Sequence, residues 1–154
     1  MRINGVLTSS LVNGDGIRYV IFLQGCPHHC DGCQNPDTWD PKGGYEISVE
    51  DLVADIKKRH LIDGITLSGG EPFMQQEECC KLIGLLPDNL DIWVYTGFRY
   101  EEVAHMPLAK VADYIVDGRF EMDNLAVGKM YGSNNQRIIN VKEWCTDGSK
   151  NEHD

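Results

Sequence analysis

The sequence predicts an α/β fold, in the form of an incomplete, open TIM-like βα barrel with a mostly parallel sheet of about five strands. Short apolar runs alternate with longer segments in which apolar residues recur at helical spacing. This alternation is typical of parallel sheets with right-handed crossovers. The chain has 154 residues, whereas a closed eight-stranded barrel needs roughly 200 or more. We therefore expect the sheet to stay open.

The first half of the chain contains three clear elements. Residues 17–23 form an apolar run that predicts the first strand. Ser48 is a suitable N-cap for a helix whose first turn carries acidic side chains. The apolar face of that helix is expected to comprise Val49, Leu52, Val53 and Ile56. A second strand is predicted at residues 64–68.

The second half continues the alternation. A helix is predicted over residues 75–86 and ended by Pro87. Its inward residues are expected to be Cys79, Leu82, Ile83 and Leu86. A third strand at 90–95 ends at Thr96-Gly97, and a short helix follows at 100–105. The last two predicted strands are 111–116 and 137–141.

The domain organisation is expected to be simple. The sequence shows no internal repeat, low-complexity segment or Pro/Ser-rich linker, and its length suits one domain with a hydrophobic core. We predict a single domain at residues 1–144 and a flexible polar tail at 145–154.

Composition excludes several classes of function. Apolar residues make up 42% of the chain and charged residues 25%, as in ordinary globular proteins. No apolar run approaches the ~20 residues of a membrane span, and the N-terminus does not resemble a secretory signal. We therefore expect a cytoplasmic protein. The net charge of −10 disfavours binding to nucleic acid, which needs clustered basic residues.

Three cysteines follow the first predicted strand at C-x3-C-x2-C spacing. They are Cys26, Cys30 and Cys33. Thiolates are the ligands that iron–sulfur clusters prefer. A four-iron cluster held by three protein ligands would leave one iron open to another molecule, so the triplet favours an enzyme over a simple electron carrier.

Two other interpretations of the triplet remain open. A structural zinc site needs four ligands, commonly in two pairs. The side chains available as a fourth ligand are His28, His29, Cys79, Cys80 and Cys145. A redox-active C-x2-C pair of Cys30 and Cys33 is the other interpretation, and it would leave Cys26 without a role.

A second motif, Gly69-Gly70-Glu71-Pro72, follows the second predicted strand. Active sites of parallel sheets lie at the C-terminal ends of strands, so this segment and the cysteine loop should face one pocket. Glycines there would let the backbone approach a ligand closely. A tight strand-to-helix turn with Pro72 near the first helical position accounts for the same residues.

The two motifs in this order resemble the radical S-adenosylmethionine superfamily. Gly32 stands where much of the superfamily has an aromatic residue, and the activating enzymes of anaerobic ribonucleoside-triphosphate reductases carry glycine there. Three further segments are similar to that branch, namely residues 14–18, 33–39 and 132–136. The resemblance covers about residues 14–141.

The resemblance implies two cofactors, a [4Fe-4S] cluster and S-adenosylmethionine. The implied metal ligands are Cys26, Cys30 and Cys33. The implied S-adenosylmethionine-binding residues are Gly32, Cys33, Gln34, Gly69, Gly70 and Glu71. No side chain is expected to act as a catalytic acid or base, because the cofactors carry the chemistry.

The resemblance also implies a reaction and partners. The reduced cluster would cleave S-adenosylmethionine, and the 5′-deoxyadenosyl radical would take a hydrogen atom from a glycine of the reductase to form a glycyl radical. Implied partners are the reductase, a one-electron donor such as a flavodoxin-like protein, and a second copy in a homodimer. Alternatives are an activase of another glycyl-radical enzyme of the pyruvate formate-lyase type, a small-molecule radical enzyme such as a deazapurine synthase, and a non-catalytic zinc-stabilised interaction module.

Overall fold

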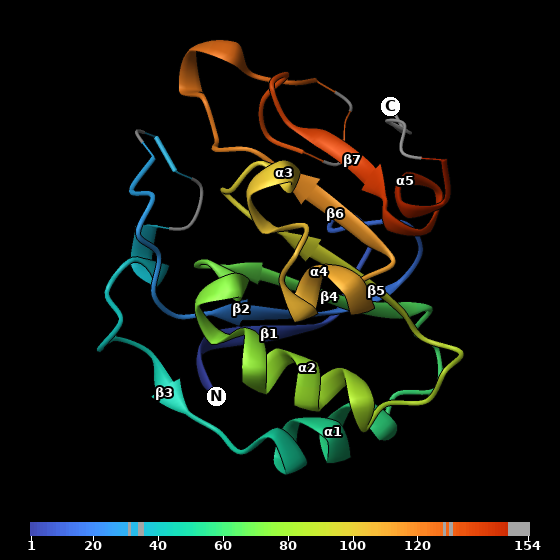
Figure 1. Cartoon of the computed structure of the whole chain (residues 1–154). Coiled ribbons are helices and arrows are strands. Elements are labelled where there is room, and N and C mark those ends of the chain that lie inside the picture. The colour runs from blue at the N-terminus through green and yellow to red at the C-terminus, as the bar shows by residue number, and fades with distance from the viewer. Residues whose placement is uncertain (31, 34–35, 128, 130, 148–154) are drawn as a thin grey trace.

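The computed structural model of the chain describes residues 1–30, 32–33, 36–127, 129 and 131–147, with only the backbone described for 145–147. Within this part, a single sheet has the strand order β3-β1-β2-β4-β5-β6-β7 (Figure 1). The strands are β1 Arg2–Ser10, β2 Arg18–Leu23, β3 Tyr45–Glu46, β4 Gly64–Gly69, β5 Asp91–Tyr95, β6 Tyr114–Asp117 and β7 Arg137–Asn140.

Five of the seven strands run in one direction. β2, β4, β5 and β6 pair in parallel. β1 is antiparallel to both β2 and β3, so β3 has the direction of the parallel group. β7 is antiparallel to β6 at the opposite edge. The mostly parallel, unclosed sheet that the alternation predicted is therefore confirmed.

The helices between the strands are short. The α-helices are α1 Val49–Lys57, α2 Gln76–Gly84, α3 Tyr100–Val103, α4 Pro107–Val111 and α5 Val141–Asp147. The 3-10 helices are Pro36–Thr38, Pro72–Gln75 and Met122–Asn124. None of the helices in the described ranges is long and apolar enough to span a bilayer.

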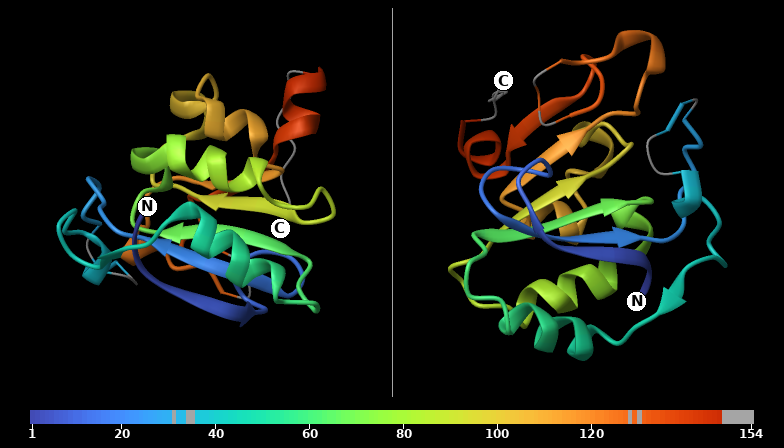
Figure 2. Two further views of the ribbon diagram at one scale, coloured as in Figure 1. Left: turned by 90° about the horizontal axis from the view of Figure 1, so that it is seen from below. Right: turned by 180° about the vertical axis from the view of Figure 1, so that it is seen from behind.

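The two faces of the sheet have different coverings. Figure 2 shows α1, α2 and α4 on one face and the loop between β1 and β2 across the other. Strand residues alternate between the two, so Ile92 and Val94 of β5 join the main core beneath the helices, whereas Trp93 packs with Val116 and Ile138 on the far side. The far face carries the smaller cluster and the cavity that both sequence motifs line.

Several predicted elements are confirmed in detail. The Ser48 side chain accepts a hydrogen bond from the Asp51 backbone N–H at 3.0 Å, so α1 begins where the sequence indicated. In α2, Cys79 and Leu82 are fully buried. Pro72 opens a 3-10 turn that leads into this helix.

Other predictions were wrong. The sequence analysis missed β1 and β3, so the sheet has seven strands rather than about five. The strand predicted at 111–116 is a helix–strand junction instead, because Pro107 opens α4 and β6 begins only at Tyr114. The fifth predicted strand is present as β7, which ends at Asn140, and α5 follows it directly. Residues 148–154 of the predicted tail lie outside the described residues.

Arg18 anchors the face that carries the cavity. It is fully buried, and its guanidinium donates to Thr66 Oγ1 at 2.7 Å and to three backbone carbonyls, those of Asp15, Ile65 and Asp91. It also pairs with the Asp91 carboxylate at 2.7 Å. The network ties the loop after β1 to the sheet.

Replacing Arg18 by Met should lower the free energy of unfolding by about 3 kcal/mol, because several buried acceptors lose their donor. Urea denaturation measures this change. Arg59→Met is the control, since its ion pair with Asp55 is half exposed and should contribute no more than about 0.5 kcal/mol. Equal losses in the two variants would contradict the prediction.

Candidate metal and cofactor site

A cavity of about 330 Å³ lies against the sheet face opposite the helices, at the ends of the central parallel strands. Its lining comes from the β1–β2 loop, the cysteine loop after β2, the ends of β4 and β5, and the segment between β6 and β7. The predicted site residues on this lining are Cys26, Cys30, Cys33, Gly69 and Gly70. The structure thus brings both sequence motifs to one cavity.

Burial and backbone N–H groups act in opposite directions on the pKa of two of the cysteines. Burial raises the pKa of the Cys26 thiol, but the backbone N–H groups of His28 and His29 point at its sulfur and favour the thiolate. Burial likewise raises the pKa of Cys30, which receives the N–H of Phe120. These amides are of the kind that stabilise thiolate ligands of an iron–sulfur cluster, so the residues fit that group.

The described side chains do not form a site for a single metal ion. No three His, Cys, Asp or Glu side chains among them converge closely enough to share one ion. A [4Fe-4S] cluster makes a different demand, because each thiolate binds its own iron. None of the described cysteine side chains is in a disulfide.

Gly32, which precedes Cys33, packs against a segment far along the chain. Gly32 has a φ of 70°, which favours glycine, and a Cβ there would collide with Met122. The close neighbour of Gly32 is thus a side chain between β6 and β7, and Gly32 does not line the cavity. Gln34 lies outside the described residues.

Gly69 and Gly70 join the end of β4 to the backbone of the cysteine loop. Gly69 has a φ of 82°, and a Cβ there would lie 2.7 Å from the Cα of Phe22. A Cβ on Gly70 would collide with the carbonyl of Gly25, and the Gly70 N–H donates to Leu23 at 2.8 Å. The backbone at the end of β4 can approach the backbone of residues 22–25 this closely only because both residues are glycines. This agrees with the tight-turn interpretation. Both glycines also line the cavity.

Glu71 has a different environment from its neighbours. Its carboxylate is fully buried and accepts hydrogen bonds from His28 Nε2 at 2.6 Å, from Thr96 Oγ1 at 2.7 Å and from the Gly97 N–H at 2.8 Å. Glu71 is not among the residues that line the cavity. The sequence offered His28 as a fourth zinc ligand or as a residue that shapes the cysteine loop, and it placed Thr96-Gly97 at a strand end, but it did not indicate that both contact Glu71.

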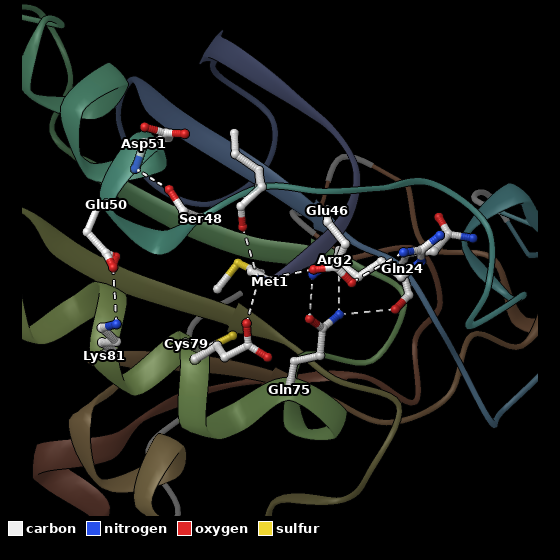
Figure 3. Close-up of polar contacts among 12 residues, drawn as sticks. Met1, Arg2, Gln24, Glu46, Ser48, Glu50, Asp51, Gln75, Cys79 and Lys81 are labelled. Atoms are coloured by element: carbon white, nitrogen blue, oxygen red, sulfur yellow. Dashed lines mark hydrogen bonds and ion pairs between the residues drawn. The ribbon is translucent and has the colours of Figure 1, made fainter.

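Two glutamines that the sequence did not single out hold the base of the cysteine loop, and Figure 3 shows one of them, Gln75, bonded to Arg2 and Gln24. The Gln24 side-chain amide donates to the carbonyls of Asp37 at 2.8 Å and Asp40 at 2.7 Å. Gln75 donates to the carbonyls of Arg2 at 2.8 Å and Gln24 at 3.1 Å, and accepts from the Arg2 N–H. These bonds fix where the loop leaves the sheet and where it returns.

The segment between β6 and β7 completes the cavity wall. Gln136 accepts hydrogen bonds from the N–H groups of Gly132 at 2.9 Å and Ser133 at 3.0 Å, and donates to Gly118 at 2.9 Å. Gly118, Gly132 and Gln136 line the cavity. Hydrogen bonds from Gln136 therefore hold the 132–136 segment in the wall of the cavity.

Comparison with known proteins agrees with these motifs. Residues 12–139 match a family described as 4Fe-4S single cluster domain. The anaerobic ribonucleoside-triphosphate reductase-activating protein of Enterobacteria phage T4 is 35% identical over 147 residues, covering 90% of this chain and 93% of the phage protein. The chain belongs to the anaerobic ribonucleoside-triphosphate reductase-activating family. The resemblance stated from the motifs is thereby confirmed.

A second reductase-activating protein and an activase of another enzyme are also similar to this chain. The reductase-activating protein of Escherichia coli strain K12 is 33% identical over 144 residues, which cover 86% of this chain and 94% of that protein. Pyruvate formate-lyase 1-activating enzyme of the same strain is 34% identical over 165 residues, but these make up only 65% of that enzyme. The match therefore spans nearly all of the reductase-activating protein but only about two thirds of the pyruvate formate-lyase activase.

Proposed function

We propose that this protein activates an anaerobic ribonucleoside-triphosphate reductase by reductive cleavage of S-adenosylmethionine at a [4Fe-4S] cluster. The observation that carries the proposal is that the cysteine triplet and Gly69-Gly70 line one cavity in a chain of this family. When bound, the cluster supplies the electron that splits S-adenosylmethionine into methionine and a 5′-deoxyadenosyl radical, which takes a hydrogen atom from a reductase glycine and leaves a glycyl radical there.

The protein's own residues hold and orient these groups. Cys26, Cys30 and Cys33 would hold the cluster as thiolates. By the resemblance, the segment around Cys33 would border the adenine, with Gly32 packed behind it against Met122, and Gly69 and Gly70 would border the methionine end. The N–H groups of Gly70 and Glu71 already donate to the carbonyls of Leu23 and Gly25. The glycine segment would therefore bind S-adenosylmethionine through its carbonyl oxygens and not through these N–H groups. Carbonyl oxygens suit a substrate ammonium group.

The cavity suits a small cofactor beneath a protein substrate. Its volume of about 330 Å³ falls in the range of ligand pockets. The segments that wall it also expose the apolar side chains of Leu11, Val12 and Val127, which a docked reductase would cover. The pyruvate formate-lyase type of activase shares the chemistry, but the reductase-activating proteins match this chain over more of their own length, which favours the reductase.

The finer details of the proposal rest on the resemblance. We propose that the sheet is the open segment of a TIM-like barrel, because its parallel strands follow in sequence order with the helices on one face. We also propose one domain at 1–144 with a tail at 145–154, a flavodoxin-like electron donor and a homodimer. A cytoplasmic location would keep the cysteines reduced.

Electron paramagnetic resonance tests the function directly. The anaerobically reconstituted, reduced protein should show a [4Fe-4S]⁺ signal that changes when S-adenosylmethionine is added. Adding the reductase should then give a glycyl radical on the reductase. Stoichiometric zinc with no iron uptake would overturn the proposal, as would a radical formed on a pyruvate formate-lyase but never on the reductase.

A further inference from the structure

The Glu71 carboxylate joins the ends of three neighbouring strands. Glu71 follows β4, its partner His28 lies in the loop after β2, and Thr96 and Gly97 follow β5. β2, β4 and β5 are adjacent in the sheet. One buried side chain therefore connects the cysteine loop to both of the next strand ends.

Every group around this carboxylate acts as a donor. The Gly97 and Phe73 N–H groups can only donate. Thr96 Oγ1 accepts from the Phe98 N–H at 3.1 Å, so its own hydrogen is directed to Glu71. This arrangement assigns the hydrogen of the 2.6 Å contact to His28 Nε2. The Glu71 carboxylate thus accepts hydrogen bonds from four protein groups, those of His28, Phe73, Thr96 and Gly97.

The His28 ring is also held from its other sides. It lies edge-on to the Phe98 ring with centroids 4.6 Å apart. A Cβ on Gly97 would collide with it, so glycine at this position makes room for the ring. Because His28 lies between Cys26 and Cys30 in the chain, fixing the ring fixes the segment that carries both thiols.

We propose that Glu71 is a positioning residue that holds the cysteine loop in place through His28, and that it does not itself contact S-adenosylmethionine. This inference rests on the proposed function, because the loop is held for the sake of the cluster and S-adenosylmethionine. Loss of the Glu71–His28 contact should loosen the loop even in the metal-free protein. A residue that acted only as a ligand of S-adenosylmethionine would have no such effect.

The test uses Glu71→Gln, His28→Leu and Thr96→Val, with Thr96→Ser as the variant that keeps the hydroxyl. In the metal-free protein, the rate at which iodoacetamide alkylates Cys26 is measured by mass spectrometry, with Cys80 on α2 as internal reference. In the reconstituted protein, the dissociation constant of S-adenosylmethionine is measured. Tyr19→Phe is the matched control, because it removes a 2.6 Å hydrogen bond to Asp55 on the helix-covered face.

We expect Glu71→Gln, His28→Leu and Thr96→Val to speed alkylation of Cys26 several-fold and to weaken S-adenosylmethionine binding about tenfold. Thr96→Ser and Tyr19→Phe should behave like the unmodified protein. The Glu71→Gln/His28→Leu double variant should be no faster than either single variant, since both break one contact. If Glu71→Gln does not fold, His28→Leu and Thr96→Val carry the test.

Two results would overturn the inference. Weaker S-adenosylmethionine binding with unchanged alkylation in Glu71→Gln would make Glu71 a direct ligand, and no change in either measurement would leave it without a role at the site. Failure of the proposed function is a separate outcome. It would appear as an unmodified protein that forms no glycyl radical, whatever the alkylation rates of the variants.

Discussion

Replacing any one of Cys26, Cys30 or Cys33 by Ala is expected to abolish binding of the [4Fe-4S] cluster and, with it, formation of the glycyl radical. In the proposed assignment each thiolate would supply one of three protein ligands, and none of the other cysteines with a described side chain lines the cavity. Cys79 is fully buried in the core. Iron and sulfide content and visible absorbance after anaerobic reconstitution measure the loss without reference to activity.

Cys80→Ala is the control for these substitutions. Cys80 lies on α2 and packs partly against the main core, away from the cavity. This variant should take up the same amount of iron as the unmodified protein. Full iron uptake by a Cys30→Ala variant would contradict the assignment of the triplet as the ligand set.

Replacing Gly69 by Ala is expected to lower the free energy of unfolding by about 3 kcal/mol. The new Cβ would lie 2.7 Å from the Cα of Phe22 and 2.8 Å from the Leu23 N, and the φ of 82° is unfavourable for any residue with a Cβ. The strand ends must separate to accommodate it, so S-adenosylmethionine binding should also weaken. Urea unfolding of the metal-free protein and the dissociation constant of S-adenosylmethionine measure the two effects.

Gly84→Ala provides the matched control. Gly84 is the last residue of α2, and a Cβ there meets nothing within 4 Å. Alanine is the better helix former by up to about 1 kcal/mol, so this variant should be as stable as the unmodified protein or slightly more stable. Equal unfolding midpoints for Gly69→Ala and Gly84→Ala would show that close backbone contact at the end of β4 does not limit stability.

Local patterns predicted the parts of the fold that depend on local chemistry. Ser48 was recognised as an N-cap because capping needs only residues three apart, and the structure shows that bond. By contrast, β1 was missed because it lies next to an edge, pairs antiparallel and is largely exposed, so its residues lack the apolar run of a buried strand. The helix at Pro107 was missed because a five-residue helix has no measurable periodicity.

The site likewise has features that local motifs predicted and a contact that they did not. The motifs placed the three cysteines and Gly69-Gly70 at strand ends, and the parallel sheet brings them to one cavity. The Glu71–His28 contact joins residues 43 apart in the chain. No local pattern encodes such a contact, because it depends on how two loops pack after the strands have paired.

The hydrogen bonds at the base of the cysteine loop bear on how the protein is assembled and repaired. The N–H groups of Gly25 and Cys26 donate to Thr38 and Trp39, and with Gln24 they join the two ends of the loop through protein groups alone. Small zinc domains, by contrast, fold only when the metal binds. We therefore expect the metal-free protein to remain folded and to take up a cluster again after losing it to oxygen.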